Sequence, residues 1–293
     1  MQCAVQSLRR VHPDHTRQPG YGILQLVNIS EPCRLCNEAR PLRLSHINPK
    51  FVFRFQRDAS ITAIRSHLTP YRPAQDSRKI RFLCGECEER FNRWETAFKR
   101  EVYDPYHTGT LSTLLYGSWL LKFAASLSWR ALRATLESGD PTPAEVQSAS
   151  VDAEIAWRHF LLDRKEHPGR FHQYLFLLRP LEQLSDPILP TNFASYVQLG
   201  AATGIWHAPR RHLTVAYCLM CSVIVVGIVS ARNVRGWGER LRVRGGTLRS
   251  NGQMPPLDVV EMIRSQARDH LEMESQIPER QKILDRKRLI AAD

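Results

Sequence analysis

The sequence lacks the short motifs that assign many chains to a class of enzyme. It contains no Gly-Lys-Ser or Gly-x-Gly-x-x-Gly loop, the arrangements that hold nucleotide phosphates. It also has no Gly-x-Ser-x-Gly elbow of the hydrolases and no His-Glu-x-x-His helix of the zinc proteases. Motif-based assignment to nucleotide-binding, serine-hydrolase or metalloprotease families is therefore unsupported.

The chain also lacks the features of a secreted protein. Its seven cysteines are an odd number, which does not suit a framework of disulfides. The first twenty residues contain several charged side chains and no apolar core of a signal peptide. We therefore expect a cytoplasmic protein in a reducing compartment, with residues 1–30 as a loose extension.

No apolar segment reaches the ~20 residues that a membrane-spanning helix needs. The nearest candidate is the 17-residue run Leu213–Val229, which has arginines on both sides. Its Val and Ile content favours a buried pair of strands with a midpoint near Cys221 and Ser222. A marginal membrane span, and with it a membrane-associated effector, is the alternative. Cys218 and Cys221 form a Cys-x-x-Cys here and are expected to be packed core thiols rather than a second metal site.

Acidic residues are scarce relative to basic ones. The 293 residues carry a formal net charge of +12 with a pI near 9.7, and 43% of them are hydrophobic. Such a chain can bury a large core, and its charge favours an anionic partner, most often nucleic acid. Residues 33–100 hold 15 Lys and Arg against 7 Asp and Glu, so much of the excess lies there. A solvated basic face without a ligand is the alternative.

Two Cys-x-x-Cys pairs dominate that basic region. Zinc takes four thiolates in a tetrahedral arrangement, and a two-residue spacer lets both sulfurs of a pair reach one ion. The pairs are separated by 47 residues, more than in a short zinc ribbon, so a segment is inserted between them. The predicted ligands of this structural Zn²⁺ are Cys33, Cys36, Cys84 and Cys87.

The residues beside these pairs carry a family resemblance. The chain reads Ser45-His46-Ile47-Asn48-Pro49-Lys50-Phe51 after the first pair and Phe82-Leu83-Cys84-Gly85-Glu86-Cys87-Glu88 around the second. These segments resemble the zinc-stabilised members of the HNH (ββα-metal, His-Me finger) endonucleases. In that family a strand ends in Asp-His-Ile-x-Pro, and a helix carries Cys-x-x-Cys-His. The resemblance covers roughly residues 31–103 and implies a zinc-stabilised ββα unit.

The resemblance also implies phosphodiester hydrolysis of DNA at a catalytic Mg²⁺ or Mn²⁺. His46 matches the family's general base, and a neutral imidazole can take a proton from water near neutral pH. Glu88 is the expected ligand of the catalytic metal, because hard cations prefer carboxylate oxygens. Asn92 and Glu95 lie on the same predicted helical face, and one or the other is expected to assist Glu88; a merely solvated polar face is the alternative. The expected phosphate contacts are Arg54, Lys79 and Arg81.

The chain departs from the family's pattern at three positions. Ser45 stands where an aspartate commonly binds the catalytic metal, Lys79 falls near an expected asparagine, and Glu88 replaces a histidine. These departures favour a rival hypothesis, a zinc-binding nucleic-acid or protein interaction module whose catalytic site has lapsed. The resemblance itself implies an effector of bacterial phage defence or of a mobile element, with a defence-system partner.

We predict an α+β chain, with an HNH-like zinc module at 31–110, a helical region at 111–170, a β-rich region at 171–255 and C-terminal helices at 256–293. The C-terminal helices carry balanced charge and suit an amphipathic flank or a homo-oligomer contact. The expected helices are Leu111–Leu136, a helix from an N-cap at Thr142 to about Arg164, Pro256–Glu274 and Pro278–Ala291. The expected strands are Phe171–Leu178, Phe193–Leu199 and a pair within Leu213–Val229.

A second basic cluster follows the last predicted strands. Six arginines lie between residues 232 and 249, with Glu239 as the acidic residue among them. Four glycines interleave them, and glycine lets a backbone approach a phosphate closely or form a turn. These arginines are expected to extend a nucleic-acid surface or to bind an acidic protein. We call this set the second basic cluster: Arg232, Arg235, Arg240, Arg242, Arg244 and Arg249.

Overall fold

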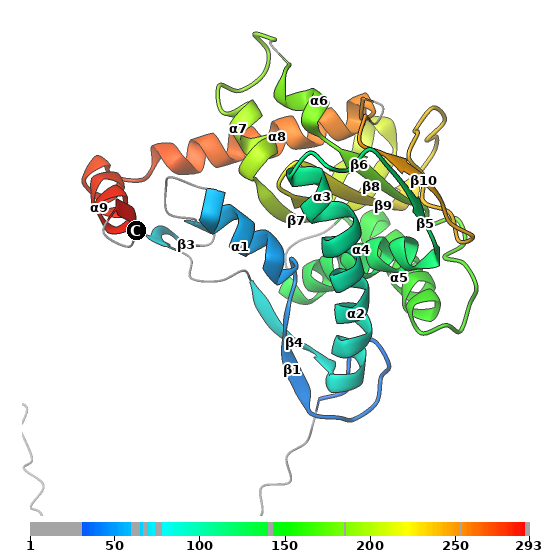
Figure 1. Ribbon diagram of the computed structural model, residues 1–293. Helices are drawn as coiled ribbons and strands as arrows, with labels where there is room; N and C mark the ends of the chain where they lie inside the picture. Colours follow the sequence, from blue (N-terminus) through cyan, green and yellow to red (C-terminus); the bar gives the residue numbers. More distant parts are fainter. Residues whose placement is uncertain are drawn as a thin grey trace, which may run out of the picture.

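The architecture is mixed α+β, built around one four-stranded sheet (Figure 1). The computed structural model describes residues 31–59, 65–66, 69–73, 78–139, 143–184, 186–251 and 254–290. The expected extension at 1–30 and the predicted N-cap Thr142 lie outside the described residues.

The central sheet is antiparallel, with strand order β6-β9-β8-β7. The predicted strand pair within Leu213–Val229 is confirmed as β8 and β9, joined at Cys221 and Ser222. Both turn residues have positive φ, 49° and 61°, as a two-residue hairpin turn that matches the twist of the strands requires. The strands are β6 (Gln173–Leu177), β7 (Ala201–Ala208), β8 (Leu213–Met220) and β9 (Val223–Ala231).

Helices cover both faces of this sheet (Figure 1). On one face, α4 (Ser118–Ser138) and α5 (Ala144–Leu161) pack against the strands. The opposite face forms a second apolar cluster with α7 (Phe193–Leu199) and α8 (Leu257–Ser275). The side chains of β8 alternate between the two clusters, because successive residues of a strand point to opposite faces. Two helical layers therefore bury both faces, which explains the nearly continuous apolar sequence of β8 and β9.

A smaller strand-strand-helix unit lies at the cysteine-rich end of the chain. β1 (Leu42–His46) pairs antiparallel with β4 (Lys79–Cys84), and α2 (Gly85–Phe98) begins directly after β4. The predicted apolar face of α2 is confirmed: Phe91 and Phe98 are buried, and α2 packs on α4. Both units contribute to a single apolar core cluster, so this unit rests directly on the helical layer of the sheet.

Short elements connect these parts. Between β1 and β4 lie α1 (Lys50–Ala59), β2 (Arg65–Ser66) and β3 (Thr69–Pro73). A π-helix, η1 (Lys99–Tyr103), and α3 (Asp104–His107) continue α2, and β5 (Thr113–Tyr116) pairs with the distant β10 (Gly246–Arg249). The remaining elements are α6 (Arg179–Glu182), η2 (Pro209–Arg211) and α9 (Glu279–Ile290).

The structure corrects the strand expected at Phe193–Leu199, which is the helix α7. Phe193, Tyr196 and Val197 are all buried, and their spacing of three and four residues is that of one helical face. Aromatic and β-branched content suggested a strand, but strand propensity reflects fit to a half-buried surface more than backbone preference. Here α7 packs beside α8 over the sheet, and burial decides the conformation.

The structure also corrects the start of the long helix expected at Leu111–Leu136. The helix α4 begins at Ser118, after Gly117, and residues 113–116 form β5. Leu115, assigned by its spacing to the buried helical face, is 80% exposed on the β5–β10 ribbon. The partner strand begins 130 residues later in the chain, so local periodicity could not indicate the pairing.

The β5–β10 ribbon depends on Gly245, which gives a testable prediction. Gly245 has φ +86°, and an added Cβ would lie 2.1 Å from the carbonyl oxygen of Tyr116. Gly236 has a similar φ of +83° with nothing within 4 Å. We expect Gly245→Ala to lower the free energy of unfolding by about 3 kcal/mol or more, and Gly236→Ala by about 1 kcal/mol, in urea titrations. Equal effects would show that backbone strain alone, without the clash, sets the cost.

None of the described helices combines the length and the apolar character needed to cross a membrane.

Candidate metal centre and adjacent polar site

The first cysteine pair lies in a tight turn that aims both sulfurs inward. Cys33 N–H donates to Glu38 O at 2.9 Å, and Asn37 N–H donates to Cys33 O at 2.8 Å. Asn37 takes φ 64°, a left-handed conformation that asparagine adopts more readily than most residues. The turn is fastened to the small sheet because Arg34 N–H donates to Phe82 O on β4 at 3.0 Å.

The second pair lies where β4 ends and α2 begins. Cys84 is the last residue of β4, and Cys87 lies in the first turn of α2. The backbone N–H of Cys84 donates to Cys33 Sγ at 3.3 Å, which ties the two pairs together. The local sequence therefore folds so that a turn and a strand-to-helix junction face one another.

The four sulfurs form one compact cluster. The ligand atoms of Cys33, Cys36, Cys84 and Cys87 all lie within 4.8 Å of one another, and all four cysteines are free. Cys36 Sγ and Cys84 Sγ are 3.9 Å apart, close to the ~3.8 Å between sulfurs of a tetrahedral site with Zn–S bonds of ~2.3 Å. The cluster can hold a metal ion such as zinc, as the spacing of the cysteines predicted.

The electrostatics of the cluster fit a metal ligand set. A hydrogen bond from Cys87 and backbone N–H groups lower the pKa of Cys33 to about 4, against its burial. The same contact to Cys33, together with burial, raises the pKa of Cys87, and burial raises the pKa of Cys36. Crowded buried thiols cannot all ionise by themselves, whereas a bound cation stabilises four thiolates at once.

The predicted catalytic histidine lies one residue from a contact between β1 and α2. Ser45 is 1% exposed, and its Oγ–H donates to Glu88 Oε2 at 2.5 Å. His46 follows Ser45 at the end of β1, is half-buried, and pairs in register with Lys79 of β4. The structure therefore brings together the strand end that carries His46 and the first turn of α2 that carries Glu88.

Glu95 has a different environment. Its carboxylate accepts a hydrogen bond from Arg130 Nη2 of α4 at 2.6 Å, and Arg130 Nη1 donates to the backbone carbonyl of His46 at 2.9 Å. Arg130 is 3% exposed, so this ion pair is largely removed from water. The guanidinium of Arg130 thus links α4 to α2, through Glu95, and to the end of β1, through the backbone carbonyl of His46.

The other predicted site residues are more dispersed. Asn92 is exposed on α2, and Arg54 is exposed on α1. Arg81 is exposed on β4, where its Nη1 donates to the carbonyl of Leu42 at 3.2 Å. Only Lys79, through its register with His46, lies opposite the histidine on the neighbouring strand.

Comparison with known proteins returns no match: no family model fits the chain, and no curated protein or solved structure is similar to it.

Two residues support this site without having been singled out from the sequence. Asn48 Oδ1 accepts from Thr203 Oγ1 at 2.9 Å and from Cys218 Sγ at 2.6 Å, so the segment after His46 is anchored to β7 and β8. Arg130 anchors the same segment from α4. Arg130 could have been singled out from the sequence because it falls among the apolar positions of a predicted helix. A charge buried there requires a partner.

Cys218 and Cys221 lie apart from the sulfur cluster. Both are fully buried, as expected for core thiols, and burial raises the pKa of each to about 12. Among the described residues, neither joins a group of side chains that could hold a metal ion.

Proposed function

We propose that this chain is a metal-dependent DNA endonuclease of HNH type, with its active site between the end of β1 and the first turn of α2. The observation that carries the proposal is the 2.5 Å contact of Ser45 with Glu88. These are the two positions where the resembling family places metal ligands, and the general base follows directly at His46. The zinc-type cysteine cluster supports the proposal because it joins the turn before β1 to the junction of β4 and α2, where Cys87 directly precedes Glu88.

The residues have distinct roles in this proposal. His46 takes the proton from the attacking water, which requires a neutral imidazole. Glu88 and the Ser45 oxygen would hold Mg²⁺ or Mn²⁺, which when bound stabilises charge on the scissile phosphate and the leaving oxygen. Asn92, four residues after Glu88 on α2, can orient a phosphate or a metal-bound water from the exposed side.

Glu95 supports the site indirectly in this proposal. Its carboxylate neutralises Arg130, and Arg130 fixes the backbone of His46. Glu95 is then a positioning residue, and Glu88 is the carboxylate left for the metal. Among the described residues, Arg54 and Arg81 form no ion pair with a carboxylate, so both are available, together with Lys79, to hold DNA phosphates.

Plasmid nicking tests the proposal. Purified zinc-loaded protein is incubated with supercoiled plasmid and Mg²⁺ or Mn²⁺, and nicked and linear products are quantified. Wild type is expected to cut, and His46→Ala is expected to lose about 10²- to 10⁴-fold in rate, the usual contribution of a general base. His167→Ala, at an exposed histidine after α5, is the matched control and should cut like wild type. Equal rates for His46→Ala and wild type would contradict the assignment.

One observation favours a second function, a zinc-dependent DNA-binding module without catalysis. The partner of the Glu88 carboxylate is the neutral Ser45 hydroxyl, which brings no negative charge of its own to a metal site. The variant Ser45→Asp separates the two functions, because it restores a second carboxylate where the family has one. If wild type binds plasmid without cutting it and Ser45→Asp gains Mg²⁺-dependent cutting, the chain is a lapsed nuclease. If wild type cuts, the active enzyme is supported.

A further inference from the structure

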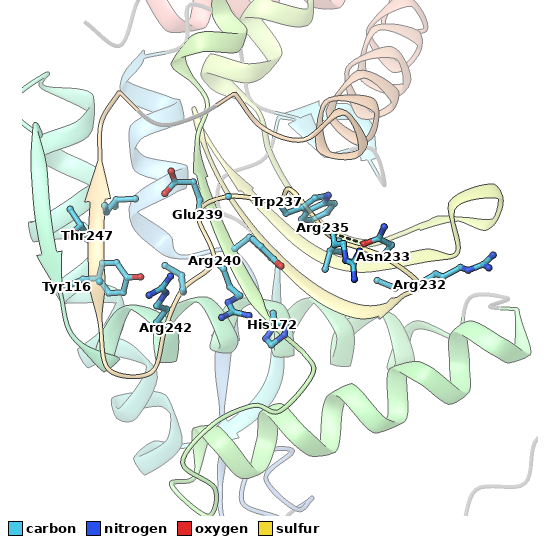
Figure 2. Close-up of a pocket in the computed structure, with 17 residues that line it drawn as sticks. Tyr116, His172, Arg232, Asn233, Arg235, Trp237, Glu239, Arg240, Arg242 and Thr247 are labelled. Carbon is cyan, nitrogen blue, oxygen red and sulfur yellow. Dashed lines mark hydrogen bonds between the residues drawn. The ribbon is translucent and has the colours of Figure 1, made fainter.

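The second basic cluster plays no part in the proposed nuclease site. Four of its arginines line a pocket of about 800 Å³ beside the edge of the central sheet (Figure 2). The pocket lies between residues 231–242, the strand β6 and the β5–β10 ribbon. Its volume is in the range of pockets that hold small organic ligands, roughly 300–1,000 Å³.

Backbone pairing fixes one wall of the pocket. Residues 239–241 run antiparallel to the free edge of β6: Leu241 N–H donates to Gln173 O at 2.9 Å, and Leu175 N–H donates to Glu239 O at 3.3 Å. Arg240 thereby forms a β-bridge with Tyr174. The arginine side chains therefore project from ordered backbone at the edge of the sheet.

The pocket has an excess of positive charge. Among the described residues, Arg235, Arg240 and Arg242 form no ion pair with a carboxylate, although each lines the pocket. Glu239 is the acidic residue in the lining, and Figure 2 shows its carboxylate directed away from Arg240 and Arg242. Unpaired guanidinium groups around a cavity favour a ligand with phosphate or carboxylate oxygens, which arginine binds in a bidentate manner.

Neutral donors lie among these arginines. His172 lies beside Arg240 (Figure 2), and burial and the charge of Arg240 lower the pKa of the imidazole. Tyr116 lies beside Arg242, and burial raises the pKa of its phenol. An imidazole N–H and a phenol hydroxyl can each donate a hydrogen bond to an anion.

An aromatic surface adjoins the charged one. Trp237 is half-buried, and its ring packs edge-on against Tyr174 at 5.2 Å and Phe176 at 6.3 Å between centroids. These contacts hold the indole in place where it lines the pocket beside Arg235 (Figure 2). A fixed aromatic ring next to guanidinium groups is the arrangement on which nucleic-acid bases stack.

We infer that this pocket binds a nucleotide, with the phosphates on Arg240 and Arg242 and the base against Trp237. The nucleotide is either a free nucleoside phosphate or the 5′-phosphorylated end of a single strand, because both present the same groups. No contiguous glycine-rich motif marks such a site in the sequence, since its walls come from residues 116, 172, 174, 231–235, 237–242 and 246–248.

Isothermal titration calorimetry in magnesium-free buffer tests the inference on the full chain. The probes are ADP, adenosine, pyrophosphate, and dT10 with and without a 5′-phosphate. The double variant R240A/R242A is expected to weaken binding of the nucleotide probe at least tenfold. Arg244→Ala, which removes an exposed arginine outside the lining, is the matched control and should stay within twofold of wild type. Binding to ADP identifies a free nucleotide as the ligand, and binding to phosphorylated dT10 alone identifies a strand end.

Three results would overturn the inference. The first is that neither ADP nor phosphorylated dT10 binds wild type. The second is that adenosine or pyrophosphate alone binds as tightly as ADP, since the base or the phosphates then contribute nothing. The third is that Arg244→Ala weakens binding as much as the double variant does. If R240A/R242A does not fold by circular dichroism, R240K/R242K replaces it, and this pair should still weaken binding because lysine lacks the bidentate geometry.

Discussion

Cys84→Ser is expected to abolish metal binding by the four-cysteine cluster and to lower the free energy of unfolding by about 5 kcal/mol or more, since structural zinc contributes roughly 10–16 kcal/mol in zinc-finger peptides. Cys84 is 1% exposed and belongs to the apolar core cluster that continues into α4 and the sheet. Loss of a metal ion held by the four sulfurs would therefore release β4 and α2 together with the turn at Cys33. Elemental analysis and thermal unfolding of the purified variant measure both effects.

Cys218→Ser is the matched control for this experiment. Cys218 is equally buried, and a serine hydroxyl can still donate to Asn48 Oδ1 as the thiol does. This variant should keep one zinc ion per chain and lose far less stability. If Cys84→Ser retains one equivalent of zinc, or if wild type contains none, the four sulfurs do not form a metal centre.

The second large effect is expected at Arg130. Arg130→Met should lower the free energy of unfolding by about 3–5 kcal/mol, because it leaves the Glu95 carboxylate as an unpaired, largely buried charge. It also removes the donor to the carbonyl of His46. Arg133→Met, which breaks a half-exposed pair with Glu137 on the same helix, should cost no more than about 1 kcal/mol.

A double-mutant cycle separates charge from positioning at this site. Arg130→Met combined with Glu95→Leu removes both charges, and hydrophobic replacement of a buried pair is often close to neutral. We expect the double variant to recover most of the lost stability but to leave about 1–3 kcal/mol, because the His46 carbonyl still lacks its donor. Equal losses for the single and double variants, measured in urea, would show that the ion pair is not coupled.

The cycle also reports on the proposed function. A stable double variant that cuts plasmid more slowly than wild type would assign Arg130 to the positioning of His46. Its rate should fall mainly in kcat at saturating DNA, because phosphate contacts are unchanged. An unchanged rate in a folded double variant would restrict Arg130 and Glu95 to a structural role.

Some features of this chain follow from local sequence alone. The two Cys-x-x-Cys spacings indicated four ligands, and the sulfurs do form one cluster. Apolar residues repeating every three to four positions predicted the buried face of α2, and the Val- and Ile-rich run predicted β8 and β9. Each of these signals is contained within one turn, one helix or one hairpin, where neighbouring residues decide the conformation.

Other features depend on contacts between residues far apart in the chain. Local propensity assigned α7 to a strand and β5 to a helix, because packing against α8 and pairing with β10 override it. The ion pair that supports His46 joins α2 to α4, and the arginine pocket joins β5, β6 and the segment after β9. The sequence by itself thus determined which residues could bind a metal, whereas the tertiary structure decided which side chains surround them. The reason is that the spacing within each Cys-x-x-Cys pair is local. The burial and pairing of a charge instead depend on elements that only the folded core brings together.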